Sequence, residues 1–308
     1  MRRLLSCCVL LLAASVVLPL SAHAQAFRTY IASYGLDTNP CTVGSPCRLL
    51  PAALAAVHDG GEIWMLDSAN YNPGTVTVTK SVSILAIPGQ VGSIVSGGGS
   101  TALSIGGGIT VTLRNVVIVN NANNPGTNGI EMTGSSKLIV EDSVIAPLGK
   151  GIYASAGGTI SVSHTAFRNS THGIQIAGNT ALDVSDSKFS NISNYGVWVD
   201  GSIASTTATA SVTDSVFTAS YLGVFCWTQA AAVARATVTR SSFTSSAYGV
   251  ASDGDGGGTA VAVVGSSMFG GTSTPLLQSG ANGAVGSQGN NLNMGGVNSG
   301  PISGVAPI

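Results

Sequence analysis

The sequence predicts an all-β protein, a single-stranded right-handed parallel β-helix with a short N-terminal capping helix. Two columns of residues recur along the chain at nearly the same interval. In the first, a glycine precedes a branched aliphatic residue at Gly129, Gly151, Gly173, Gly196, Gly223 and Gly249. In the second, phrases such as "VSHTAF" and "VTDSVF" end at Ile118, Ile145, Phe167, Phe189, Phe217, Phe243 and Phe269. The steps in both columns are 22 to 28 residues, which is typical of one coil of a β-solenoid.

The residue types within the repeats favour strands over helices. Val, Ile, Thr and Phe fill the phrases, and Gly and Asn lie between them, as expected for strands that end at turns. Coils stacked in register would place each inward side chain on its equivalent in the next coil. The segments "DGSIASTTATA", "TQAAAVARA" and "SDGDGGGTA" lengthen one connection in successive coils. We expect them to form a wall on one side of the solenoid.

Residues 1–24 have the pattern of a signal peptide. Two arginines precede an apolar run, and a small-x-small motif ends at Ala24, where cleavage is expected. The apolar run is too short for a comfortable membrane span. We therefore expect a secreted or periplasmic chain without membrane insertion.

Residues 25–61 predict an N-terminal cap. In an oxidising compartment, Cys41 and Cys47 can close a small disulfide loop. The stretch that follows has apolar residues at helical spacing and stops at Gly60 and Gly61. Such a helix would cover the open end of the coil stack.

The coils are expected over residues 62–271, and residues 272–308 predict a last irregular coil with a Gly/Asn-rich tail. Cys226 has no obvious partner. At an inward strand position it is expected to be a small buried apolar residue.

The composition excludes two classes of protein. Charged residues make up 8% of the chain and the formal net charge is -1, so no basic patch is available for a nucleic acid. The hydrophobic content of 44% is spread evenly in short runs, which does not fit a disordered chain.

The opening phrase of the mature chain, "YIASYGLDTNPCTVGSPCRLLPAALAAVHDGGEIWMLDSANY", resembles the amino-terminal cap and first coil of pectin-lyase-like right-handed β-helix proteins exported by bacteria. The resemblance extends over nearly the whole mature chain. It implies carbohydrate binding or cleavage, although the fold alone does not fix function. Where relatives often carry Pro-Gly-x-Tyr, this chain has Ser68-Ala69-Asn70-Tyr71.

The sequence predicts no catalytic residue. Asp142, Asp186 and Asp214 recur at one phase of the repeat, which would suit carboxylate chemistry. Equivalent places in other coils hold Asn, His, Arg and Ser, so the phase is interpreted as a turn at which Asp or Asn bonds backbone amides. Asp253 and Asp255 offer oxygen ligands for calcium, with a flexible surface turn as the alternative. No zinc site is expected, because no acidic residue lies at ligand spacing from the histidines.

Strand alternation predicts a binding face. If Val197 and Val199 point inward, Trp198 points outward, and the same phase puts other aromatic and polar side chains into one outward column. The residues predicted to bind a ligand are Tyr153, Gln175, Tyr195, Trp198, Phe225, Trp227 and Tyr248. Flat rings beside polar groups suit the faces of sugar rings. The alternative is that loops cover these rings.

The preferred functional hypothesis is therefore a non-catalytic exported β-helix that presents a face to a glycan or a cell-surface component. A polysaccharide lyase or glycoside hydrolase is the first alternative, and a structural or adhesive surface protein is the second. No cofactor is expected, apart from the calcium considered above. The oligomeric state stays open.

Overall fold

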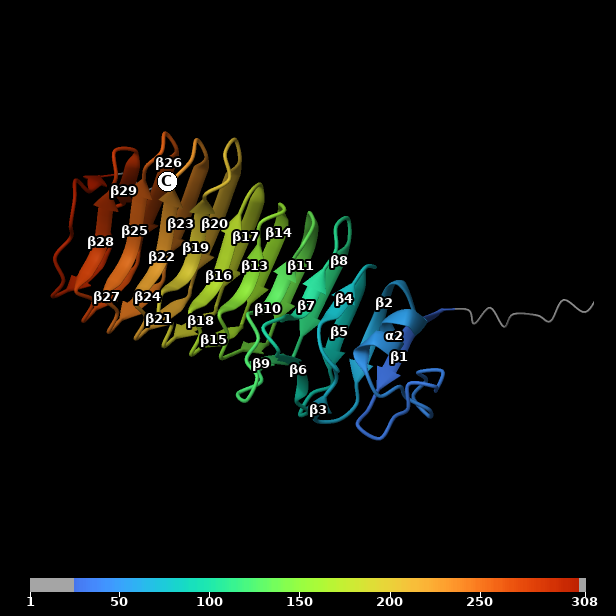
Figure 1. Cartoon of the computed structure of the whole chain (residues 1–308). Helices are drawn as coiled ribbons and strands as arrows, with labels where there is room; N and C mark the ends of the chain where they lie inside the picture. The colour runs from blue at the N-terminus through green and yellow to red at the C-terminus, as the bar shows by residue number, and fades with distance from the viewer. Residues whose placement is uncertain (1–24, 305–308) are drawn as a thin grey trace, which may run out of the picture.

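The computed structural model describes residues 25–304 and confirms the parallel β-helix (Figure 1). The predicted signal peptide lies outside the described residues. The coils stack along one axis and form three parallel sheets of twelve, nine and ten strands, which differ in number because the end coils do not contribute to all three. Each coil of the central stack visits the nine-stranded, the twelve-stranded and then the ten-stranded sheet.

The strands are short, as the turn spacing predicts. The twelve-stranded sheet contains β1 (Ala26–Ile31), β2 (Val57–Met65), β5 (Val82–Ala86), β8 (Thr110–Arg114), β11 (Ser136–Glu141), β14 (Gly158–Ser163), β17 (Thr180–Ser185), β20 (Thr207–Thr213), β23 (Val233–Thr239), β26 (Thr259–Gly265), β29 (Gly283–Ser287) and β31 (Ser303–Gly304). The nine-stranded sheet contains β4 (Val76–Val78), β7 (Thr101–Ile105), β10 (Asn128–Met132), β13 (Lys150–Ala154), β16 (His172–Ala177), β19 (Tyr195–Gly201), β22 (Leu222–Thr228), β25 (Tyr248–Gly254) and β28 (Thr274–Ser279). The ten-stranded sheet contains β3 (Ala69–Asn70), β6 (Gly92–Ser96), β9 (Val116–Asn120), β12 (Val144–Ile145), β15 (Ala166–Arg168), β18 (Lys188–Ser190), β21 (Val216–Thr218), β24 (Ser242–Thr244), β27 (Met268–Gly270) and β30 (Leu292–Met294).

The core is a set of side-chain ladders. Five buried phenylalanines, one per coil, stack with near-parallel rings whose centroids lie 4.7 to 5.0 Å apart. The glycine of the first repeat column lies directly against this ladder. A Cβ atom on Gly196 would lie 2.7 Å from Phe217 Cε1, and one on Gly223 would lie 2.3 Å from Phe243 Cε1. The two sequence columns therefore recur together because the ring needs the space that glycine leaves.

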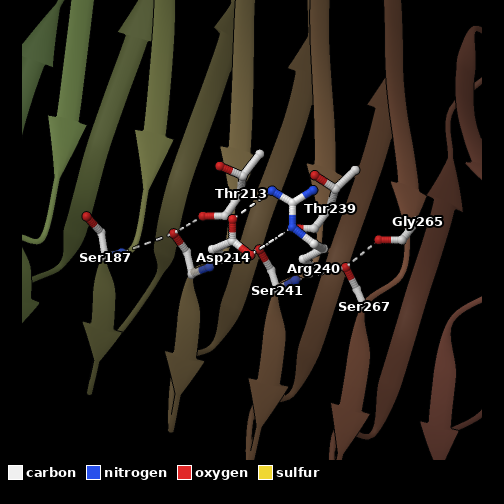
Figure 2. Close-up of polar contacts among 9 residues, drawn as sticks. Ser187, Thr213, Asp214, Thr239, Arg240, Ser241, Gly265 and Ser267 are labelled. Atoms are coloured by element: carbon white, nitrogen blue, oxygen red, sulfur yellow. Dashed lines mark hydrogen bonds and ion pairs between the residues drawn. The ribbon is translucent and has the colours of Figure 1, made fainter.

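A hydroxyl ladder closes the corner between the twelve-stranded and ten-stranded sheets (Figure 2). Ser215 Oγ donates to Thr213 O at 2.8 Å and accepts from Ser187 N–H in the preceding coil at 3.2 Å. Ser241 repeats both bonds one coil later. The pattern runs through the buried hydroxyls of Ser143, Thr165, Ser187, Ser215, Ser241 and Ser267. Each corner thus satisfies backbone groups that the strand ladder leaves unpaired.

The residue before each of these hydroxyls adopts a left-handed backbone conformation, which confirms the turn interpretation of the aspartate phase. The φ angles are 48 to 51° at Asp142, His164, Asp186, Asp214, Arg240 and Ser266. Asn115, at the same phase but followed by Val116, has a φ angle of 54°. The expected side-chain bonding to backbone amides was wrong for Asp214. Its carboxylate instead accepts two hydrogen bonds from the Arg240 guanidinium of the next coil, at 2.9 and 2.7 Å (Figure 2).

The N-terminal cap forms as predicted, with one correction. Cys41 and Cys47 form the disulfide, and the helix α2 (Leu50–Ala56) buries Leu50, Ala53 and Leu54 on the first coil. The helix is shorter than the sequence predicted. It ends at Ala56 rather than at the glycines at 60 and 61, because β2 already begins at Val57. The strand β1 extends the twelve-stranded sheet beyond β2.

The three insertions lengthen strands more than loops. The strands β19, β22 and β25 each have seven residues where β10 and β13 have five. The strands that follow them in the chain, β20, β23 and β26, also have seven. These longer strands stack as a continuous wall (Figure 1). Beyond residue 271 the stacking continues through β28, β29 and β30 as regular strands. Cys226 lies fully buried in the core, as expected, and burial raises the pKa of its thiol.

Candidate functional site

The predicted outward column exists on the nine-stranded sheet. Strand register aligns Glu131, Tyr153, Gln175, Trp198, Phe225 and Ala251 in successive coils. Two further columns flank it, one starting at Lys150 and His172, the other aligning Asp200, Trp227 and Asp253. We call the outward side of this sheet the outer face.

Aromatic side chains of three neighbouring coils contact one another on the outer face. The ring of His172 lies 5.3 Å from both Tyr195 and Trp198, measured between centroids. Tyr195 lies 4.8 Å from Phe225, and Trp198 lies 6.0 Å from Trp227. We call these five residues the aromatic cluster. The tilted and edge-to-face angles are those that aromatic pairs prefer.

The other predicted binding residues lie around this cluster. Tyr248 contacts Tyr221 edge to face at 5.3 Å. Tyr153 lies under the Lys150 ammonium, whose Nζ is 3.9 Å from the ring centroid, a cation–π contact. Gln175 is 4% exposed, and its Nε2 donates to Asp200 Oδ2 at 2.7 Å.

The rings are partly exposed. Every ring of the aromatic cluster has an intermediate exposure, and each ring packs near at least one other ring of the cluster. The insertions lengthen the neighbouring strands of the same sheet. The outer face is thus a partly exposed, mutually packed aromatic surface.

Unpaired polar atoms also gather on this sheet. Five buried side-chain polar atoms of the described residues have no hydrogen-bond partner, namely Asn128 Oδ1, His172 Nδ1, Gln175 Oε1, Trp198 Nε1 and Asp253 Oδ1. All five belong to strands of the nine-stranded sheet. Burial of an unpaired polar atom costs about 1–3 kcal/mol, so such a concentration marks a site that a hydrogen-bonding group can stabilise.

Burial also shifts the pKa of the titratable groups here. It lowers the pKa of His172 to about 4, with a smaller contribution from the positive charge of Lys150. It also lowers the pKa of Lys150, against the opposing effect of Asp200 and Glu131. At Asp253, burial and the neighbouring Asp255 raise the pKa of the carboxyl. The histidine is therefore neutral at neutral pH.

We expect acidification to destabilise the protein through His172. The pKa of the ring is about 4 in the folded chain and 6.5 in the unfolded chain, so the unfolded state takes up the proton first. The stability associated with the neutral His172 ring is fully present above pH 6.5 and is lost as the pH falls from 6.5 towards 4. The change in the free energy of unfolding stays below about 1.4 kcal/mol per pH unit, the limit for one proton, since solvent screens this partly exposed ring. Urea unfolding of the protein and of His172→Gln at pH 7 and pH 5 measures it, and an equal pH dependence in both would contradict the assignment.

The structure also forms a groove that the sequence did not predict. Trp64, Pro88, Arg114 and Asp142 line a hollow of about 550 Å³ on the twelve-stranded sheet near its N-terminal end. Its polar groups are largely paired. Glu62 accepts from Arg28 at 2.7 Å and from Trp64 Nε1 at 3.0 Å, and Arg114 lies 3.8 Å from Asp142. Strand register brings these side chains together from successive coils, so no local spacing along the chain indicated the groove.

Between residues 25 and 304, no three His, Cys, Asp or Glu side chains lie close enough to form a metal site. Calcium binding at Asp253 and Asp255 stays a prediction. No helix within the same range is long and apolar enough to span a bilayer.

Fold and site together define a right-handed β-helix protein with an aromatic outer face. A family model described as the right handed beta helix region matches residues 90–243, half of the chain. The chain belongs to this right-handed β-helix family. A search of curated protein sequences gives no significant match.

Several solved structures share the fold at low sequence identity. An alginate lyase from Paenibacillus sp. str. FPU-7 is similar with a TM-score of 0.66 and 10% identity, over 90% of this chain and 100% of the lyase. A polygalacturonase from Erwinia carotovora ssp. carotovora gives a TM-score of 0.58 and 11% identity, over 91% and 98% of the two chains. A pectin methylesterase from Erwinia chrysanthemi gives 0.53 and 11%, over 87% and 92%. These names cover three different reactions, so the shared fold does not select one.

Proposed function

We propose that this protein is exported and binds a polysaccharide non-catalytically through the outer face of the nine-stranded sheet. The aromatic cluster carries the proposal: five partly exposed rings from three successive coils, on a sheet whose strands also carry five unpaired polar atoms. Apolar ring faces beside hydrogen-bonding groups match the surface of a sugar chain. The solved structures of similar fold include enzymes named for polysaccharides, and the disulfide fits an oxidising compartment.

A non-catalytic role is favoured by the way the carboxylates are used. Asp214 is held by Arg240 at an exposed turn, and Glu62 is paired with Arg28. On the outer face, Asp200 accepts from Gln175 and from Ser202 N–H. Glu62 lines the groove on the twelve-stranded sheet, but like Asp214 and Asp200 it is engaged by a neighbouring donor. Carboxylates engaged in this way favour a structural role over that of an acid and base pair.

Replacement of Trp198 by alanine tests the proposal. We expect the affinity for the bound polysaccharide to fall about 30-fold, which corresponds to the 2 kcal/mol typical of an aromatic anchor. Removal of the indole from its packing against His172, Tyr195 and Trp227 costs about 1–2 kcal/mol of stability, so the chain stays folded. Tyr153→Ala is expected to weaken binding less, because its ring lies outside the cluster.

Retention on insoluble glycans and affinity electrophoresis in soluble ones measure the change, with circular dichroism to confirm the fold. Tyr34→Ala is the matched control, because Tyr34 is 68% exposed on the N-terminal cap. Trp64→Ala measures, in the same assay, whether the groove on the twelve-stranded sheet contributes to polysaccharide binding. Unchanged retention of the Trp198 variant, or release of reducing or unsaturated sugar ends by the protein, would contradict the proposal.

A further inference from the structure

The charged side chains of the nine-stranded sheet are mostly acidic. Its strands carry three carboxylates, Glu131, Asp200 and Asp253, against one ammonium, Lys150. His172 adds no positive charge at neutral pH because its pKa is about 4. The single cation is already engaged, since Lys150 lies on the Tyr153 ring.

The unpaired polar atoms are a second, independent indication of which ligand the outer face suits. Asn128 Oδ1, Gln175 Oε1 and Asp253 Oδ1 are acceptors, whereas Trp198 Nε1 is the one obligatory donor among the five. Gln175 is 4% exposed and its Nε2 is fixed on Asp200, so its Oε1 has to receive a hydrogen bond from elsewhere. Hydroxyl groups donate and accept, but an ionised carboxylate only accepts. The site is therefore short of donors, and a uronate carboxylate supplies none.

We infer that the outer face takes a neutral, hydroxyl-rich glycan and discriminates against uronate chains. This inference rests on the proposed function and specifies its ligand. Sugar hydroxyls supply the hydrogen-bond donors that the three acceptors lack when these buried side chains turn towards the ligand, and the aromatic cluster receives the apolar faces of the sugar rings. A chain with a carboxylate on each sugar meets like charges on a partly desolvated surface and finds no free cation to pair with.

Polygalacturonate and its fully methyl-esterified form are suitable probes, because the two polymers share one backbone and differ in charge. Neutral glucomannan and xyloglucan, and acidic alginate, complete the panel. We expect at least one neutral polymer to bind, and every acidic polymer to bind about tenfold more weakly at low ionic strength, as expected for several like charges at about 10 Å. Added salt should narrow the gap through screening.

The double variant Glu131→Gln/Asp253→Asn tests the electrostatic cause while keeping the side-chain shapes. Its affinity for polygalacturonate should rise several-fold. The matched control is Asp183→Asn, which removes the same type of charge from an exposed position on the twelve-stranded sheet, and which should leave that affinity unchanged. An equal affinity of the double variant and the unmodified protein for polygalacturonate would overturn the inference.

The outcomes separate the two proposals. Tightest binding to an acidic polymer, weakened by Trp198→Ala, overturns the neutral-glycan inference and leaves the binding face in place. Tightest binding that is insensitive to Trp198→Ala overturns both, as does a lack of binding to every polymer. Tightest binding to a neutral polymer, weakened in the Trp198 variant, supports both.

Discussion

Phe217→Ala is expected to lower the free energy of unfolding by about 3–5 kcal/mol, the usual cost of emptying a buried phenylalanine site. The ring is fully buried and stacks between Phe189 and Phe243 at 4.7 and 4.8 Å. Its removal leaves a cavity that the two neighbouring coils cannot close, because the strand register fixes their spacing. Denaturant unfolding followed by circular dichroism measures the loss.

Two variants control for the position in the ladder. Phe269→Ala should cost less, since Phe269 stacks on Phe243 on one side and meets Asn293 on the other. Phe27→Ala should change stability by less than about 0.5 kcal/mol, as expected for a surface position, because Phe27 is 61% exposed. A decrease below about 1 kcal/mol for Phe217→Ala, on the scale of those large-to-small costs, would show that the stacked rings do not hold the coils together.

Gly223→Ala is expected to destabilise the protein by about 3 kcal/mol, the upper end of the usual cost of overpacking. The added Cβ would lie 2.3 Å from Phe243 Cε1 and 2.7 Å from Gly249 O in the next coil. The ring is held by its neighbours in the ladder, and the carbonyl belongs to a paired strand. Displacement of either group would disrupt the ring stack or the strand pairing, so the added methyl group has to be accommodated by a shift of the whole coil.

A second substitution tests the cause of this destabilisation. Phe243→Leu in the Gly223→Ala background removes one of the two clashes, so the double variant should be more stable than the sum of the two single costs predicts. Gly74→Ala is the control, because a Cβ at Gly74 meets nothing within 4 Å. Strictly additive costs would mean that the ring is not what excludes a side chain at position 223.

The hydroxyl ladder shows where the sequence was readable and where it was not. The serine is visible in phrases such as "VTDSVF", at a constant place before the inward phenylalanine. Its role was missed because one of its two hydrogen-bond partners, such as Ser187 N–H for Ser215, lies a whole coil away. The turn at Asp214 was predicted, but its pairing with Arg240 was not, for the same reason.

Only part of the candidate site could likewise be predicted from the sequence. Alternation about Val197 and Val199 was enough to place Trp198 outward. The contacts of Trp198 with His172 and Trp227 depend on strands that lie side by side although 26 and 29 positions separate the residues along the chain. The charge balance around Gln175 likewise depends on which strands share the sheet.

The coil and its inward residues could be predicted from the sequence, because they follow from local alternation and from a repeat that recurs many times along the chain. The N-terminal disulfide could be predicted from two cysteines that lie close together in the sequence. Which outward side chains share a surface depends on the tertiary structure. Stacking brings residues about one coil apart into contact at strand spacing, so the aromatic cluster, its unpaired acceptors and its acidic balance arise from register. No single coil contains them.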